Sequence, residues 1–518
     1  MSAPAKLLFV GLDAADRDHI LRWADEGRLP TLRRLLDRGV SATTLAPLGM
    51  HAASVWHSFF TAVTPARHGR HGDRQVRPGT YEMYRFWPSD TKREAFWNAL
   101  SRAQRRVAVI DVPYVAPSKD LNGIHVVDWT SHAMDSGFCT TPPELAREIC
   151  RRFGHDPVGL CDHRPMRTAA EFAAFRDALV AKVSTKVALS RHFLARGGWD
   201  LFLTVFGESH CAGHQCWHLS DPGHPRFDAE MAATVGNPML DVYRALDGAI
   251  GQLLEDAGAP ATVFVLATHG MGPFYNGAHL LGEILARLGH TPPPPAPSQA
   301  WALLRWGWRR LPARLRARLT PLHKAAVDRV WPDLDPRANC FDMPNGEVYG
   351  AIRLNLVGRE PAGRIHPGAE SEAFCEQLTR DLRALVNVDT GRAVVRRVLR
   401  TAELYQGPYL DDLPDLLVEW NSEAPLSTVQ SPKTGIIERV FDGTRTGHHK
   451  REGLLIACGP GIKPARLPEP VSIMDVAPTV AALLGVTLPD VDGRPIAACL
   501  EEKGCALAGS PAPARSLA

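Results

Sequence analysis

The chain has 518 residues, of which 45% are hydrophobic and 22% are charged, proportions that are typical of a soluble globular protein. A chain of this length can form roughly two to four domains, or one large α/β domain with insertions. Its formal net charge of +3 gives no reason to expect a nucleic-acid partner, so any binding of anions must be local.

The N-terminal apolar run, residues 7–10, is too short for the core of a signal peptide and ends at Gly11. No stretch reaches the ~18 continuous apolar residues of a membrane span, and we therefore expect a cytoplasmic protein. The 10 cysteines include no C-x-x-C pair and no disulfide framework. We expect reduced thiols, and neither a thiolate zinc site nor a redox pair.

Short apolar runs alternate with longer helical segments along the chain. The runs predict buried parallel strands, in chain order at residues 7–10, 107–110, 201–206, 262–267, 416–418 and 454–457. Helices are predicted between them at residues 30–38, 169–195 and 239–257. This alternation predicts an α/β fold with a mostly parallel central sheet that helices cover on both faces.

One basic segment interrupts the pattern. Residues 1–290 form the first part of the predicted core, and prolines at 292–297 then predict a stiff linker. Residues 301–331 are rich in Arg and Trp, which predicts an inserted helical cap or arm over 291–345 that can contact an anionic membrane surface. The core resumes over 346–500, and low complexity predicts a disordered tail at 501–518.

Acidic and histidine side chains follow several predicted strands. In parallel sheets, ligands bind beyond the carboxyl ends of the strands, so these side chains are expected in one pocket. A lone histidine is more often a satisfied core or turn residue, but four separate segments that supply such groups favour a metal site. Asp13, Glu208, His210, Thr268 and His269 come after predicted strands, and His449 comes just before the strand predicted at 454–457.

Longer motifs occur at both ends of the chain and between them. They are 11–16 (GLDAAD), 27–32 (GRLPTL), 56–69 (WHSFFTAVTPARHG), 111–113 (DVP), 446–453 (TGHHKREG), 475–479 (DVAPT) and 492–495 (DGRP). Together they resemble the type I phosphodiesterase/nucleotide pyrophosphatase branch of the alkaline phosphatase superfamily over most of residues 5–498. The resemblance implies an alkaline-phosphatase-like α/β/α sandwich and a hydrolase of phosphoric esters or diesters, with sulfuric esters as a related class.

The resemblance also implies a site for two metal ions, usually zinc, which hold a phosphoryl oxygen and activate a Ser or Thr nucleophile. One metal position corresponds to His210, His214 and His449 of this sequence. The other corresponds to Asp13, Ala52, Thr268 and His269.

At the first metal position, His210 stands where the family has an Asp. His210 and His214 are four residues apart, so on a helix they share one face. With His449 they can form a neutral three-histidine zinc site with an open position for water, as in some catalytic zinc sites. This metal position therefore keeps three side chains that can bind a metal ion, as in the family.

The second metal position departs further from the family. Thr268 replaces an Asp, and a Thr hydroxyl is a poor ligand for a divalent ion. Ala52 occupies the nucleophile position and cannot attack; His51 or Ser54 can replace it only if the loop is shifted. We therefore expect one zinc ion rather than two.

Two functions remain open at this point. In the first, metal-activated water hydrolyses a small phosphoric ester or phosphodiester, or a sulfate ester, with Asp13, Glu208, Thr268, His51 and Ser54 as candidate catalytic residues. In the second, hydrolysis is lost and the pocket binds or transforms an anionic metabolite. A metal-free pseudoenzyme is a further alternative, and neither the substrate nor the oligomeric state follows from the sequence.

Overall fold

The computed structural model describes residues 6–50, 52–131, 136–156, 165–258, 260–292, 333–346, 349–441 and 443–501. Most of the insert predicted at 291–345, including its basic segment 301–331, lies outside these ranges. His51 and nearly all of the predicted tail lie outside them too. The predicted domain boundaries, and any membrane contact of the insert, stay predictions.

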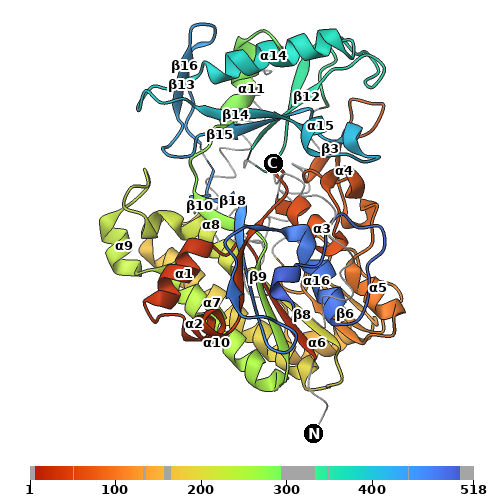
Figure 1. Ribbon diagram of the computed structural model, residues 1–518. Coiled ribbons are helices and arrows are strands. Elements are labelled where there is room, and N and C mark those ends of the chain that lie inside the picture. The colour runs from red at the N-terminus through yellow and green to blue at the C-terminus, as the bar shows by residue number, and fades with distance from the viewer. Residues whose placement is uncertain are drawn as a thin grey trace.

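A ten-stranded sheet lies at the centre of the larger part of the molecule (Figure 1), in the order β20-β2-β19-β9-β1-β8-β5-β6-β7, with β21 paired to β2. From β9 to β6 all neighbouring strands are parallel, whereas β19 and β7 run antiparallel. The mostly parallel sheet predicted from the sequence is therefore confirmed. The strands are β1 (Leu7–Leu12), β2 (Val40–Leu45), β5 (Val107–Ile110), β6 (Gly123–Val127), β7 (Cys139–Thr141), β8 (Leu201–Phe206), β9 (Thr262–Ala267), β19 (Glu452–Cys458), β20 (Ala465–Arg466) and β21 (Val471–Ser472).

Helices cover both faces of this sheet. Successive side chains of a strand point to opposite faces, so Leu8 and Val10 of β1 enter one core while Leu7 and Phe9 enter the other. The first face packs against α1 (Arg17–Asp25), α2 (Pro30–Arg38), α7 (Ala169–Leu194), α8 (Glu208–Ser220), α9 (Ala229–Val235) and α10 (Pro238–Ala257). The second packs against α3 (Ala52–Thr61), α5 (Phe96–Arg102) and α16 (Val476–Leu483). The predicted α/β/α sandwich is confirmed.

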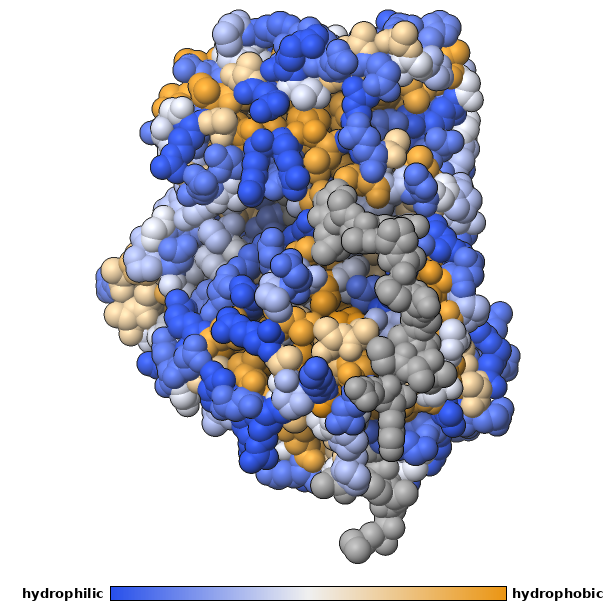
Figure 2. Space-filling view, viewed as in Figure 1, coloured by the Kyte–Doolittle hydropathy of each residue, from blue (hydrophilic) through white to orange (hydrophobic). Residues whose placement is uncertain are grey.

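A smaller part lies above the sandwich in Figure 1. Its antiparallel sheet β11-β12-β15-β14 packs against α11 (Ala278–Arg287) and α14 (Ala369–Arg383). The strands are β11 (Cys340–Met343), β12 (Gly350–Leu354), β14 (Val395–Arg400) and β15 (Leu416–Trp420), and a neighbouring sheet holds β13 (Val386–Asn387), β16 (Thr428–Ser431) and β17 (Gly435–Glu438). Hydrophilic residues are spread over the visible surface of both parts (Figure 2).

For two predicted strands, the expected place in a parallel central sheet is wrong. Residues 416–418 fall in β15 of the small antiparallel sheet, and 454–457 fall in β19, which joins the central sheet antiparallel to both neighbours. A short apolar run shows that a strand is buried on both faces, but it carries no information on the direction of that strand or on its partners.

The other elements are short. They are β3 (Arg74–Val76), β4 (Met83–Arg85), β10 (Gly270–Pro273), β18 (Gly447–Lys450), α4 (Pro65–His68), α6 (Leu145–Phe153), α15 (Thr401–Leu404), η1 (Pro88–Asp90), η2 (Leu410–Asp412), η3 (Ile473–Asp475) and η4 (Ala497–Cys499). β10 and β18 pair with each other. Each helix within the described residues falls short of the length and apolar content that crossing a membrane requires.

Candidate active site

Polar residues gather at one edge of the central sheet. β1 lies between β8 and β9 in register, so that Leu12 pairs with both Phe206 and Ala267. The carboxyl ends of these strands are therefore level. β19 is antiparallel to β9, so its amino end lies at this same edge. β18, which comes just before β19 in the chain, therefore lies there too and carries His449. The polar residues that follow the parallel strands are Asp13 after β1, Glu208 after β8, and Thr268 and His269 after β9.

Three buried histidines meet there. His210 and His214 lie one turn apart on α8, and His449 faces them from β18. Their ring centroids are 4.4 Å (His210 to His214), 4.6 Å (His214 to His449) and 5.0 Å (His210 to His449) apart. One ring nitrogen of each lies within 4.8 Å of the other two, which makes this the single group of His, Cys, Asp or Glu in the described residues with a geometry suited to a metal ion.

Hydrogen bonding fixes the tautomer of His214. Its Nδ1 lies 2.8 Å from the carbonyl oxygen of Gly447, an acceptor, so Nδ1 carries the proton and Nε2 presents a lone pair. This Nε2 lies 3.0 Å from Nε2 of His449. Burial, with His214, His269 and His210 as neighbours, holds the pKa of His449 well below its usual value. The His449 ring is therefore neutral near neutral pH.

The donor set fits a zinc ion. Two imidazole nitrogens at 3.0 Å repel each other unless a proton or a cation lies between them. With zinc–nitrogen bonds of ~2.0–2.1 Å, tetrahedral ligands are separated by about 3.3 Å. Three histidine ligands also leave a fourth position for water, as catalytic zinc sites require.

Asp13 and His269 border this cluster. Oδ1 of Asp13 accepts a hydrogen bond of 2.8 Å from the Trp56 indole and lies 4.0 Å from Nε2 of His269. The His269 ring centroid is 4.6 Å from that of His449. The Thr268 hydroxyl lies 2.9 Å from Nδ1 of His269. Thr268 thus contacts its neighbouring ring, where the family has a carboxylate.

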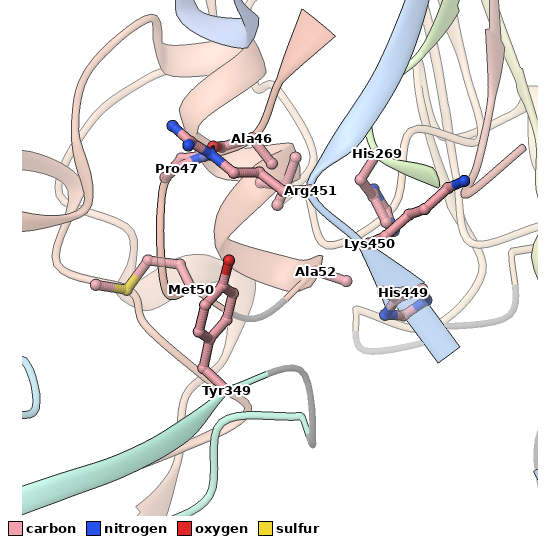
Figure 3. A pocket seen from close by; sticks show the side chains of 10 residues that line it. Ala46, Pro47, Met50, Ala52, His269, Tyr349, His449, Lys450 and Arg451 are labelled. Carbon is pink, nitrogen blue, oxygen red and sulfur yellow. Dashed lines mark hydrogen bonds between the residues drawn. The ribbon is translucent and has the colours of Figure 1, made fainter. Parts of the chain in front are cut away.

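A cavity lies beside His449, and Ala52 faces it between His449 and Tyr349 (Figure 3). Ala52 begins α3 and stands at the nucleophile position implied by the resemblance. Its methyl group offers no oxygen. The lining residues are Ala46, Pro47, Met50, Ala52, Val55, His269, Tyr349, His449, Lys450 and Arg451.

Two other predicted catalytic residues lie elsewhere. Ser54 is fully buried, and its hydroxyl donates to the Arg70 carbonyl oxygen at 2.8 Å; it does not line the cavity. Glu208 is also fully buried, and its nearest charged partner is Nζ of Lys186 at 4.0 Å. Lys186 lies 3.2 Å from Asp111, so Glu208 belongs to a buried charge network.

The sequence interpretation assigned no role to Tyr349, Lys450 or Arg451. Lys450 is drawn away from the cavity by Asp16 at 2.6 Å and Asp18 at 2.9 Å. Burial opposes its charge, but the two carboxylates outweigh burial and raise the pKa of Lys450. The position of Lys450 next to His449 was the one available signal. Tyr349 comes from the smaller part, and no spacing pattern links it to the site.

Cys211, beside His210, is disulfide-bonded. The expectation of reduced thiols throughout is therefore wrong at this residue, because no spacing pattern in the sequence marks it. The free cysteines of the described residues are Cys139, Cys150, Cys216, Cys340, Cys375, Cys458 and Cys499.

Comparison with known proteins gives one family. The family model described as type I phosphodiesterase / nucleotide pyrophosphatase matches residues 7–408. A search of proteins with curated functions gives no match. Similar solved structures include two crystal structures of phosphonoacetate hydrolase from Sinorhizobium meliloti 1021, with phosphonoformate (TM-score 0.48) and with phosphonoacetate (TM-score 0.46). Each is 15% identical, over 92% of this chain and 94% of that chain.

Proposed function

This chain belongs to the type I phosphodiesterase/nucleotide pyrophosphatase family of hydrolases, and from that premise we propose that it hydrolyses a small phosphoric ester or phosphodiester with one zinc ion. Sulfate esters are the related alternative class. The observation that carries the proposal is the cluster of His210, His214 and His449 within 4.8 Å, next to a cavity in which Ala52 takes the place of a nucleophile.

His210, His214 and His449 would hold the zinc ion, which when bound would supply a Lewis acid and lower the pKa of water from 15.7 toward ~7. With Ala52 in the cavity, no covalent phospho-enzyme forms at that position, so water is the attacking group. Asp13, whose Oδ1 lies 4.0 Å from Nε2 of His269, would accept the proton of such a water or orient it. Thr268 holds the His269 ring through its 2.9 Å contact.

The second metal position has too few ligands to bind a zinc ion tightly. Of the four family groups at that position, this chain keeps Asp13 and His269. An oxygen of Asp13 already accepts a hydrogen bond from Trp56, and Thr268 adds no charge to offset the desolvation of a divalent ion. These contacts support one tightly bound metal ion per chain.

Metal analysis with turnover of para-nitrophenyl phosphate esters tests the proposal. We expect about one zinc ion per chain, and His214→Ala should lose both the metal and activity, because one nitrogen of three is gone. His218→Gln is the matched control: His218 lies one turn further along α8 and contacts the Thr446 hydroxyl at 3.1 Å instead. Two tightly bound ions, or a trapped phosphorylated Ser54, would contradict the single-metal mechanism.

Ala52 also supports a second candidate, a relative that binds or transforms an anionic metabolite without hydrolysis. A zinc-loaded chain that binds phosphate or sulfate but turns over no ester would favour it. A chain that binds neither metal nor anion would favour a pseudoenzyme. The cytoplasmic location stays a prediction.

A further inference from the structure

Lys186 is a buried cation that lies outside the histidine cluster. It belongs to α7, and its side chain is 1% exposed. Its Nζ donates a hydrogen bond of 2.9 Å to the Val205 carbonyl oxygen. The same atom lies 3.2 Å from Oδ2 of Asp111 and 4.0 Å from Oε1 of Glu208. A cation buried this deeply is costly unless other groups compensate it, so these three contacts hold the ammonium in place.

The partners of Lys186 belong to three elements that meet at the edge of the sheet where the histidines lie. Asp111 follows β5, the carbonyl acceptor lies near the end of β8, and Glu208 is the first residue of α8. Asp111 is itself fixed, because it accepts hydrogen bonds from the amides of Trp129 at 2.8 Å and Thr130 at 3.0 Å. Lys186 therefore links two strand ends to the first turn of α8.

Lys186 keeps its charge at neutral pH. Burial opposes this charge, but Asp111 and Glu208 outweigh burial and raise the pKa of Lys186. Within the described ranges, neither carboxylate oxygen of Glu208 has a hydrogen bond. Both Lys186 and Glu208 are shielded from water, where charges 4.0 Å apart attract each other more strongly than at the surface.

The first turn of α8 depends on contacts from other elements. Its N-cap residue is Gly207, which has no side chain to cap the helix. Instead, the Ser209 hydroxyl donates to the Asp13 carbonyl oxygen at 2.7 Å, and Glu208 reaches the buried lysine. His210 lies in this same turn, so these two contacts set its position.

His214 is held by different contacts. Its carbonyl oxygen accepts from the Thr446 amide at 2.6 Å, and its Nδ1 lies 2.8 Å from the Gly447 carbonyl oxygen. The second turn of α8 is thus fastened to β18, whereas the first turn is fastened to α7 and β1. Metal–ligand distances hold to about ±0.2 Å, so a small movement of the first turn takes His210 out of reach of a shared metal ion.

Building on the proposed zinc site, we propose that Lys186 is a positioning residue that holds the first turn of α8 so that His210 stays within reach of the other two histidines. Lys186 acts through Glu208 and the end of β8, and belongs neither to the histidine cluster nor to the cavity lining. A charge effect has the opposite sign, because a buried cation repels a divalent metal ion. Loss of this cation tightens zinc binding if charge alone matters, and weakens it if position matters.

Lys186→Met tests this role, because it keeps a long unbranched side chain and removes the ammonium group. We expect the zinc affinity, measured by chelator competition, to fall about 10–100-fold, as loss of outer-shell support for a ligand typically does. Loaded with Co²⁺ alone, the variant should show weaker visible absorption than wild type, because that absorption depends on tetrahedral coordination. A zinc affinity equal to or higher than that of wild type would overturn the role of Lys186.

Lys182→Met is the matched control. Lys182 lies one turn earlier on α7, is also 1% exposed, and pairs with Asp156 at 2.9 Å instead. The control therefore loses a buried lysine from the same helix and should have a lower Tm, but its zinc affinity should match wild type. An equal fall in zinc affinity in both variants would show that Lys186 only stabilises α7.

If Lys186→Met fails to fold, the double variant Lys186→Met/Glu208→Gln takes its place. It leaves no unpaired carboxylate and keeps the net charge of the network, so a charge effect on zinc largely cancels. Its zinc affinity should still fall at least 10-fold, and an affinity equal to that of wild type would overturn the positioning role. A wild-type chain that binds neither zinc nor Co²⁺ would instead overturn the proposed function, and this inference with it.

Discussion

Ala52 is the residue that decides between two hydrolytic routes. A serine is activated as a nucleophile by an adjacent base or by a metal ion, and the ligands for that second metal ion are incomplete here. We expect Ala52→Ser to keep kcat within about threefold of wild type, because an unactivated hydroxyl is a weak nucleophile. Turnover and rapid-quench trapping with labelled phosphate would measure this.

Ala53→Ser is the control for adding a hydroxyl to the first turn of α3. Its side chain lies in the core of the second sheet face, away from the cavity lining. A phosphorylated residue 52 in Ala52→Ser would show that the second metal position is functional after all.

At the residue scale, local spacing predicted only part of the site. The four-residue separation of His210 and His214 placed both on one helix face, and a motif supplied His449; the structure brings all three together. Spacing could not place Ser54 or Tyr349. The partner of Ser54 is a distant backbone carbonyl, and Tyr349 reaches the cavity through packing between two sheets.

At the scale of elements, the site depends on close contact between β18 and α8. A Cβ atom on Gly447 would lie 2.1 Å from the Gly213 carbonyl oxygen, so the strand and helix touch through glycines. Gly447 also accepts the hydrogen bond that orients His214. Any side chain at position 447 must therefore push His449 away from α8.

We expect Gly447→Ala to weaken zinc binding about 10–100-fold, as loss of outer-shell support for a ligand typically does, and to destabilise the fold by about 1–3 kcal/mol through overpacking. Chelator competition and urea unfolding would measure the two effects. Gly272→Ala is the matched control, because it lies opposite His448 in the paired strand and its Cβ would meet nothing closer than 3.9 Å. Equal zinc affinity in both variants would show that the contact does not position His449.

The pattern of apolar residues predicted where several strands and helices lie. It did not predict which strands pair or in which direction they run. The runs 107–110, 201–206 and 262–267 coincide with β5, β8 and β9, and the helix predicted at 30–38 is α2. β15 and β19 were recognised as strands but assigned to the wrong direction. The neighbours of a strand depend on contacts between distant segments, which a single apolar run does not encode.

At the scale of the whole molecule, the fold buries many histidines besides those of the candidate site. His57, His68 and His125 are all fully buried. The Nδ1 atom of His125 accepts from the Ser118 amide at 3.1 Å, and Nε2 of His68 lies 2.9 Å from the Ser58 hydroxyl. These contacts suit neutral rings, so the folded state as a whole disfavours their protonation.

This burial makes stability depend on pH. Desolvation lowers the pKa of His68 and of His125 to about 3, and that of His57 well below its usual value; Arg70 adds to the shifts of His57 and His68, and Asp111 opposes that of His125. In the unfolded chain each histidine takes up a proton below about pH 6.5. The stabilisation is therefore complete above that pH and is lost as pH falls toward about 3.

Between about pH 5.5 and pH 4, we expect the free energy of unfolding to fall by about 1.4 kcal/mol per pH unit for each such histidine, or about 4 kcal/mol per pH unit for the three together. Urea unfolding at several pH values would measure the slope. His125→Gln should reduce it by about one third, since Gln can still accept from the Ser118 amide and takes up no proton. His155→Gln, at an exposed position, is the control for loss of a histidine. If the slope of His125→Gln matched that of wild type, His125 would be protonated in the folded chain, and its burial would not be a source of acid instability.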